Sequence, residues 1–104
     1  MDTDILSSFT YELLAPYTGQ TFQIRFTDGT LEVTLEQVEK LKEKHVDPKL
    51  MRDTFALYFR GPREYPMPQG TYAFFHETLG GPLPIFLVLL GSDANGCRYQ
   101  AIFN

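Results

Sequence analysis

Hydrophobic and polar residues alternate one by one in two neighbouring stretches near the start of the chain. In residues 21–27 every second side chain is Phe or Ile, and in residues 31–35 every second side chain is Leu or Val. This alternation is typical of β-strands with one buried face. Asp28-Gly29 lies between the two stretches. A pair of this kind predicts a β-hairpin with a type I′ turn, whose two central residues have positive φ.

A second hairpin is expected near the end of the chain. Asn95-Gly96 separates a continuous hydrophobic run over residues 83–90 from a β-type run over residues 98–103. A continuous run has hydrophobic side chains on both faces of a strand. Residues 83–90 are therefore expected to form the most buried strand of the protein.

The alternating pattern changes after residue 35. Leu35, Val38 and Leu41 are spaced by three, which suits either a helical turn or a strand whose phase is reset by a bulge. The bulged strand is favoured because its hairpin partner is already in place, so the second strand is expected over residues 30–41. A helix within residues 36–44 stays open as the alternative.

The remaining segments complete a mainly β protein. A short helix over about residues 7–16, capped by Ser7 or Ser8 and stopped by Pro16, precedes the strands. The aromatic side chains occupy two faces, which one open sheet cannot hide. We expect a single domain over residues 1–104: a small six-stranded antiparallel barrel or barrel-like sandwich, largely a meander, with the helix at an open end. The expected strands cover about residues 21–27, 30–41, 54–60, 70–76, 83–90 and 98–103.

Composition narrows the class of protein. The chain has 104 residues, a net charge of −4 and one cysteine. Its mild acidity argues against nucleic-acid binding, which normally needs a surplus of Lys and Arg. Its longest hydrophobic run falls short of the roughly 20 residues of a membrane span, and its acidic start is unlike a secretory signal. A lone cysteine forms no internal disulfide, which fits a reducing compartment, so we expect a cytoplasmic protein. From its charge and its hydrophobic runs, we expect it to bind neither nucleic acid nor membranes.

Residues that usually carry chemistry are sparse. His45, His76 and Cys97 lie too far apart in the sequence to match a metal-ligand spacing. No serine lies in a nucleophile elbow, and no Gly-rich loop precedes a helix. We therefore expect no metal, no cofactor and no catalytic residue. An enzyme built from loop residues such as His76, Glu77 and Arg98 is the least favoured hypothesis.

Positive charge is concentrated in one segment. Seven of the nine Lys and Arg residues lie between residues 40 and 63. This segment is either a surface that docks on an acidic partner or a solvated loop. Its candidates for partner contact are Lys40, Lys42, Lys44 and Arg63.

A proline-rich loop over residues 61–70 is the second candidate surface. It carries Tyr65 and Met67 between its prolines. A stiff, extended loop presents such side chains to a protein partner at a low ordering cost. Equally, Tyr65 and Met67 can fold back and plug one end of the barrel.

Several strings in the chain occur together in a known family. They are Gly19-Gln-Thr-Phe22, Phe59-Arg-Gly-Pro62, Pro68-Gln-Gly-Thr-Tyr72, Ile85-Phe-Leu-Val88 and Arg98-Tyr-Gln-Ala-Ile-Phe-Asn104. Together they resemble a bacterial domain family of unknown function and about this length. The resemblance implies one domain from a bacterial or phage source and brings no activity, cofactor or catalytic residue. The resemblance also suggests that the protein is a small accessory component, encoded near tail-fibre-like assembly proteins.

These observations favour a non-enzymatic structural or protein-interaction module. We expect it to be an accessory component of a larger bacterial or phage-like assembly that binds a protein partner or a second copy of itself. The alternative is a small-ligand-binding β-barrel with an aromatic-lined pocket.

Overall fold

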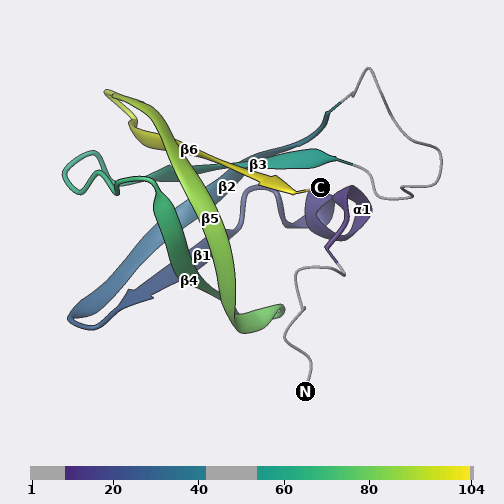
Figure 1. The fold of residues 1–104 in the computed structure, drawn as a ribbon, viewed down its shortest axis with the longest axis horizontal. Helices are drawn as coiled ribbons and strands as arrows, with labels where there is room; N and C mark the ends of the chain where they lie inside the picture. Colours follow the sequence, from purple (N-terminus) through teal and green to yellow (C-terminus); the bar gives the residue numbers. More distant parts are fainter. Residues whose placement is uncertain (1–8, 42–53, 104) are drawn as a thin grey trace.

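The computed structural model describes residues 9–41 and 54–103, which form a closed antiparallel β-barrel (Figure 1). A single helical turn, α1 (Tyr11–Leu14), and a 3-10 turn, η2 (Ala15–Tyr17), precede the strands. The expected six-stranded antiparallel fold with a short helix near the N-terminus is confirmed, and it is a barrel. Its strands are β1 (Thr21–Phe26), β2 (Gly29–Lys40), β3 (Phe55–Gly61), β4 (Gly70–His76), β5 (Gly80–Asp93) and β6 (Gly96–Phe103).

The barrel consists of two three-stranded meanders, β1-β2-β3 and β4-β5-β6. The two are joined where β3 pairs with β6 along its whole length. The barrel closes where β1 meets β4 at Gln23–Phe75 and Ile24–Phe74. Because the link from β3 to β4 connects strands that are not neighbours, the expected meander holds within each half and not across the whole sheet.

Both expected hairpins are present, but the expected turn geometry is wrong. The β1–β2 pairing reaches Phe26–Gly29, so Thr27 and Asp28 form the turn. Within the described ranges, only glycines have a positive φ. Asp28 therefore does not adopt the left-handed conformation that a type I′ turn requires.

A side chain holds the β5–β6 turn. The strands pair up to Asp93–Gly96, and the Asp93 carboxylate accepts a hydrogen bond from the Asn95 backbone N–H at 2.8 Å. This hydrogen bond lowers the pKa of Asp93 below its ordinary value. An Asp side chain that binds the backbone two residues further on stabilises a turn without a left-handed residue at Asn95.

β2 is one bent strand and not a strand followed by a helix. Its register against β3 shifts between Leu35 and Gln37, which marks a β-bulge. The strand continues to Lys40. The expected bulged strand is confirmed and the helical alternative is wrong through Lys40, while residues 42–44 lie outside the described ranges.

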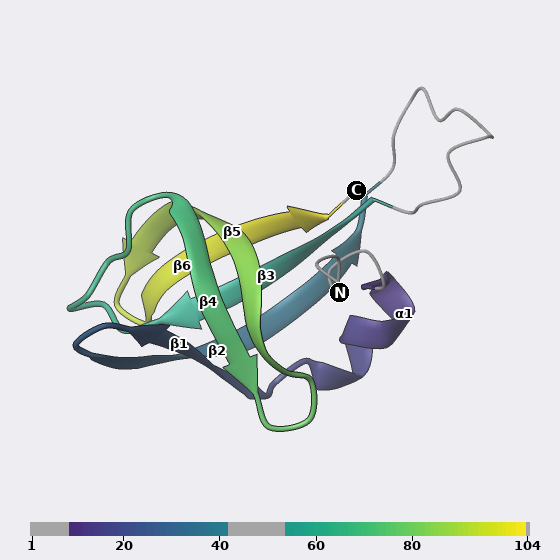
Figure 2. The same ribbon diagram turned by 60° about the horizontal axis from the view of Figure 1, so that its bottom comes forward.

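The helix begins later than expected, at Tyr11. Thr10 is the N-cap, and its hydroxyl accepts a hydrogen bond from the Leu13 N–H at 3.1 Å. The expected caps, Ser7 and Ser8, lie outside the described residues. No helix in the described ranges is long and apolar enough to cross a membrane. Figures 1 and 2 both place α1 beside one end of the barrel.

Aromatic rings fill the barrel interior. The rings of Phe22, Phe59 and Phe74 pack against one another. The ring centroid of Phe22 lies 5.5 Å from that of Phe59 and 6.5 Å from that of Phe74, and the centroids of Phe59 and Phe74 are 5.0 Å apart. Tyr99 is completely buried beside this cluster. Dense ring packing of this kind is what holds a small closed sheet together.

β3, and not β5, is the most buried strand. Every residue of β3 except Arg60 is buried. In β5, burial alternates from Leu83 to Leu87, and Phe86 is half exposed. The expectation for β5 was wrong because a continuous hydrophobic run does not show whether its second face is covered. This run places hydrophobic side chains on the outside of the barrel.

Candidate functional site

The two candidate residues of the proline-rich loop differ in their exposure to solvent. Tyr65 exposes 67 % of its surface, whereas Met67 exposes 5 %. Each alternative considered for this loop therefore holds for one residue. Met67 folds back into the core, and Tyr65 stays accessible to a partner.

Tyr65 lines a groove of about 680 Å³ between the loop and the β1–β2 hairpin. Figure 2 shows this loop and hairpin at the same end of the barrel, opposite α1. The rings of Phe26 and Tyr72 meet edge to face in the groove, with centroids 5.9 Å apart. We call this site the proline-loop groove; its hydrophobic lining is Phe26, Leu31, Tyr65, Pro66, Met67, Pro68 and Tyr72.

Hydrogen bonds to the barrel strands hold the proline-rich loop in place. The Met67 backbone N–H donates to the Tyr99 hydroxyl at 2.8 Å. The Tyr72 hydroxyl donates to the Pro68 carbonyl. Two tyrosines on different strands thus fix the backbone on the C-terminal side of Tyr65, so that this side chain is presented on an ordered support.

The groove carries negative charge and no opposing cation. Asp28 and Glu64 are its charged lining residues, and both are exposed. Lys and Arg are absent from the lining described here. A hydrophobic groove with acids at its rim matches a ligand that combines hydrophobic side chains with a positive charge.

Two of the candidate basic residues, Lys40 and Arg63, lie in the described ranges, and they make separate contacts. Lys40 lies 3.3 Å from the Glu12 carboxylate and 5.2 Å from the centroid of the Tyr11 ring. It therefore attaches α1 to β2. Arg63 is exposed in the proline-rich loop, and its carbonyl accepts a weak hydrogen bond from the Cys97 thiol. The two other candidates lie outside the described residues: Lys42 and Lys44.

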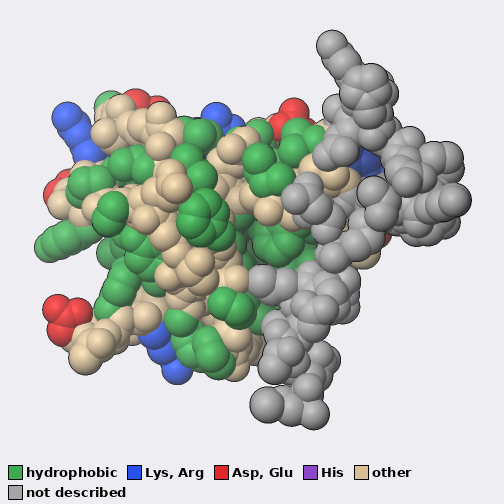
Figure 3. Space-filling view, viewed as in Figure 1, with side chains coloured by type: hydrophobic (Ala, Val, Ile, Leu, Met, Phe, Trp, Pro, Cys, Tyr) green, Lys and Arg blue, Asp and Glu red, His purple; other side chains and the backbone are tan. Residues whose placement is uncertain are grey.

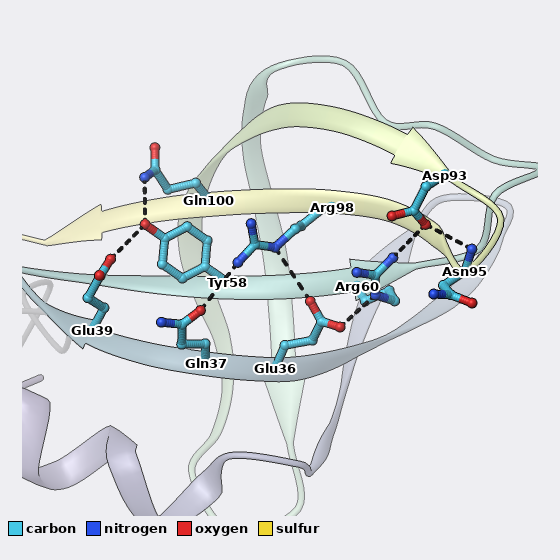
Figure 4. A network of polar contacts seen from close by, with 9 residues as sticks. All are labelled: Glu36, Gln37, Glu39, Tyr58, Arg60, Asp93, Asn95, Arg98 and Gln100. Atoms are coloured by element: carbon cyan, nitrogen blue, oxygen red, sulfur yellow. Dashed lines mark hydrogen bonds and ion pairs between the residues drawn. The ribbon is translucent and has the colours of Figure 1, made fainter.

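Polar side chains cover the outer face of β3 (Figure 4). The Tyr58 hydroxyl donates to Glu39 at 3.0 Å and accepts from Gln100 at 3.1 Å. The Arg98 guanidinium lies over the Tyr58 ring at 4.6 Å. Tyr58 is buried as a result, although it faces away from the core.

The charged end of this row is mutually paired. Glu36 binds Arg60 at 2.6 Å and Arg98 at 3.6 Å, and Arg60 also binds Asp93 at 3.0 Å. The bond to Glu36 is the main cause that raises the pKa of Arg60. Because these charges satisfy one another, the row is a cover for β3 and not an open site for an ion.

A second, more polar groove of about 830 Å³ contains His76. The His76 Nδ1 accepts hydrogen bonds from the backbone N–H groups of Thr78 and Leu79, at 3.0 and 3.3 Å. The ring proton is therefore on Nε2, which donates to the Gln20 Oε1 at 2.7 Å. The Nδ1 atom thus holds the turn after β4, and Nε2 links it to the residue that precedes β1.

These contacts leave the enzyme hypothesis without support from His76. Neither nitrogen of the ring meets a carboxylate, although Glu77 lines the same groove. Arg98 is engaged with Glu36 on another face. Within the described residues, no group of three His, Cys, Asp or Glu side chains is placed to hold a metal ion.

The ring-filled interior also gives no support to a ligand inside the barrel. Phe22, Phe59, Phe74 and Tyr99 each expose at most 1 % of their surface. An aromatic-lined pocket exists, but it is the proline-loop groove at the end of the barrel.

Comparison with known proteins found one family. The family model described as Domain of unknown function (DUF6916) matches residues 9–103. Neither the curated proteins nor the solved structures gave a match. The matched range includes all the strands and the whole proline-loop groove.

Proposed function

The chain belongs to the family described as Domain of unknown function (DUF6916), and we propose that it is a non-enzymatic protein-interaction module. Its ligand is an extended segment of a protein partner, bound in the proline-loop groove. The expected resemblance to a family of unknown function is confirmed at the level of the family. The role itself rests on the geometry of the groove.

One observation carries the proposal: an exposed aromatic side chain on an ordered support. Tyr65 exposes 67 % of its surface and lines the same groove as Phe26 and Tyr72. Hydrogen bonds from the loop to Tyr99 and Tyr72 fix the backbone that follows Tyr65. Large aromatic residues on ordered supports dominate the binding energy of many interfaces.

The lining of the groove defines the chemistry of the partner segment. Its aromatic and proline side chains suit a hydrophobic or proline-containing strand, whose extended backbone loses little entropy on binding. Asp28 and Glu64 favour a Lys or Arg in that segment. We therefore propose a basic, extended peptide segment as the ligand.

The biological setting is part of the same proposal. We place the module in the cytoplasm, as an accessory component of a larger bacterial or phage-like assembly. The single cysteine, which is free and buried, is in keeping with a reducing compartment. The strings shared with the bacterial family motivate the assembly role.

Affinity capture from an extract of the native host tests the proposal. The parent protein is compared with Tyr65→Ala and Asp28→Lys, and bound proteins are quantified by mass spectrometry. We expect one or more specific proteins to be captured by the parent and reduced at least about ten-fold by either variant, because both remove groove contacts.

Leu13→Ala is the control, since Leu13 is an exposed hydrophobic residue on α1, outside the groove. It should capture the same proteins as the parent. Equal capture by Tyr65→Ala and the parent, or a loss as large with Leu13→Ala, would remove the groove as the binding site.

A further inference from the structure

The outer face of β5 carries an uninterrupted stripe of hydrophobic side chains. Its outward positions are Pro84, Phe86 and Val88. Exposed Leu90 follows them at a bulge, where the register against β6 shifts between Leu89 and Gly91. Phe86 exposes 50 % and Leu90 exposes 47 % of its surface. Outward positions of a solvated strand are normally polar. A hydrophobic stripe at these positions therefore indicates a surface that another molecule covers.

The neighbouring strands extend this stripe into a face without charge. Cross-strand pairing places Thr71 beside Phe86, Ala73 beside Pro84, and Gln100 beside Val88. Ile102, two residues beyond Gln100 on the same side of β6, exposes 54 %. We call this the uncharged face; its members are Thr71, Ala73, Pro84, Phe86, Val88, Leu90, Gln100 and Ile102.

Charged side chains border the uncharged face. Arg98 of β6 pairs with Gly91, next to Leu90, and marks the limit of the face at that end. Figure 3 looks onto β4 and β5 and shows hydrophobic and uncharged surface at the centre, with Lys, Arg, Asp and Glu at the margins. On the opposite side of the barrel, the outward positions of β2 and β3 carry Glu36, Glu39 and Arg60. The barrel therefore has one charged side and one uncharged side.

We propose that the uncharged face binds a second copy of the chain in a two-fold symmetric dimer. In such an interface the same patch contacts itself, so a patch of one sign of charge would repel its copy. The chain has a net charge of −4, and the described acids lie off this face. The uncharged face is thus the side on which two acidic copies approach each other with the least repulsion.

The area of the face fits a small dimer interface. Five partly exposed hydrophobic side chains present on the order of 300–400 Å² of apolar surface. Each partner of a standard interface buries about 800 Å², of which a little over half is apolar. The face supplies most of that apolar share, so we expect dissociation in the micromolar range.

Dimer formation leaves the proline-loop groove open. The groove lies at one end of the barrel and shares no residue with the uncharged face. The two proposals are therefore independent, and either can fail without the other.

Sedimentation equilibrium over a micromolar concentration range tests the dimer. The parent should rise from the monomer mass of 11.9 kDa toward twice that value as concentration increases. Leu90→Asp and Phe86→Asp should stay at the monomer mass, because each would bury two uncompensated carboxylates at the two-fold interface. Leu13, on α1, exposes 38 % of its surface and lies outside the uncharged face, so Leu13→Asp should behave as the parent does.

Thermal melting of each variant separates misfolding from loss of the interface. In addition, isotope-filtered NMR of a mixed labelled and unlabelled sample should show contacts between copies at the Phe86 ring. A parent that stays monomeric at every concentration, or contacts between copies located elsewhere, would overturn the proposal.

Discussion

Tyr99 connects the core of the barrel to the proline-loop groove. Its ring is completely buried, and its hydroxyl accepts the hydrogen bond from the Met67 N–H that fixes the loop. Burial raises the pKa of Tyr99 to about 12, from the ordinary value of 10.0 for a tyrosine. The hydroxyl thus stays protonated in the folded protein at pH values where the unfolded chain has lost this proton.

This difference predicts a loss of stability at high pH. Between about pH 10 and pH 12 the folded state binds more protons at Tyr99 than the unfolded state, so the free energy of unfolding falls as pH rises through this window. Below about pH 10 the contribution is fully present. A shift of this size corresponds to roughly 2–3 kcal/mol across the whole window.

Tyr99→Phe isolates this effect. At neutral pH it should destabilise the fold by about 1–2 kcal/mol, because the buried Met67 N–H loses its acceptor. Toward pH 11 the difference between parent and variant should shrink, because only the parent loses stability through residue 99. Urea unfolding at a series of pH values measures it, and a difference that is constant with pH would contradict the assignment.

At the scale of elements, the two hairpins were predictable and their turns were not. The alternation on both sides of Asp28-Gly29 identified β1 and β2, and the spacing of Leu35 and Val38 identified the bulge. The turn type failed because a two-residue loop also closes around ordinary backbone angles when the paired strands already set its ends. At the second turn, the Asp93 side chain does this work.

The two turn glycines therefore have different roles. Gly96 has φ +127°, and a Cβ there would collide with the Gly61 carbonyl oxygen. Gly29 lies outside the positive-φ region and has open space around its Cα. The glycine of the second hairpin is required by a close approach of two backbones, and that of the first is not.

We expect Gly96→Ala to destabilise the protein by roughly 3 kcal/mol, from backbone strain and steric overlap. Gly29→Ala is the matched control and should change stability by less than about 0.5 kcal/mol. Chemical denaturation of the two variants measures both values. Equal effects would show that the close approach at Gly61 is not a constraint.

β5 shows the limit of reading a single strand. Its continuous hydrophobic run predicts burial on both faces, but only the inner face is covered within the chain. A pattern of residue types does not distinguish a face that packs in the core from a face that packs on another molecule. The dimer proposal assigns the outer face of β5 to the second of these cases, a face that packs on another molecule.

At the scale of the whole molecule, the fold class was predictable but the candidate groove was only partly so. Tyr65 was identified from its loop, whereas Phe26 and Tyr72 were not, because both lie within predicted strands, where a hydrophobic side chain is expected in the core. They become part of a site because the β3–β4 link returns beside the β1–β2 hairpin. The sequence pattern within each strand carries no information on that arrangement.

The basic segment shows the same limit. Its positive charges are close in sequence, and the sequence left open whether they form one docking surface or a solvated loop; of its members, only Lys40, Arg60 and Arg63 lie in the described ranges. Lys40 meets Glu12, Arg60 meets Glu36 and Asp93, and Arg63 stays in the loop. Neighbours along the chain became partners of acids from elsewhere.

The interior of this barrel is filled with side chains, and we propose that its exposed hydrophobic side chains contact other chains. Site-specific photo-crosslinking in the native host tests this most directly, with a photoreactive phenylalanine analogue placed at Tyr65, Phe86 or the exposed control position Gln23. We predict that the probe at Tyr65 links to a different protein, the probe at Phe86 to a second copy, and the probe at Gln23 to neither. Equal labelling from all three positions, or none from Tyr65 and Phe86, would contradict the account.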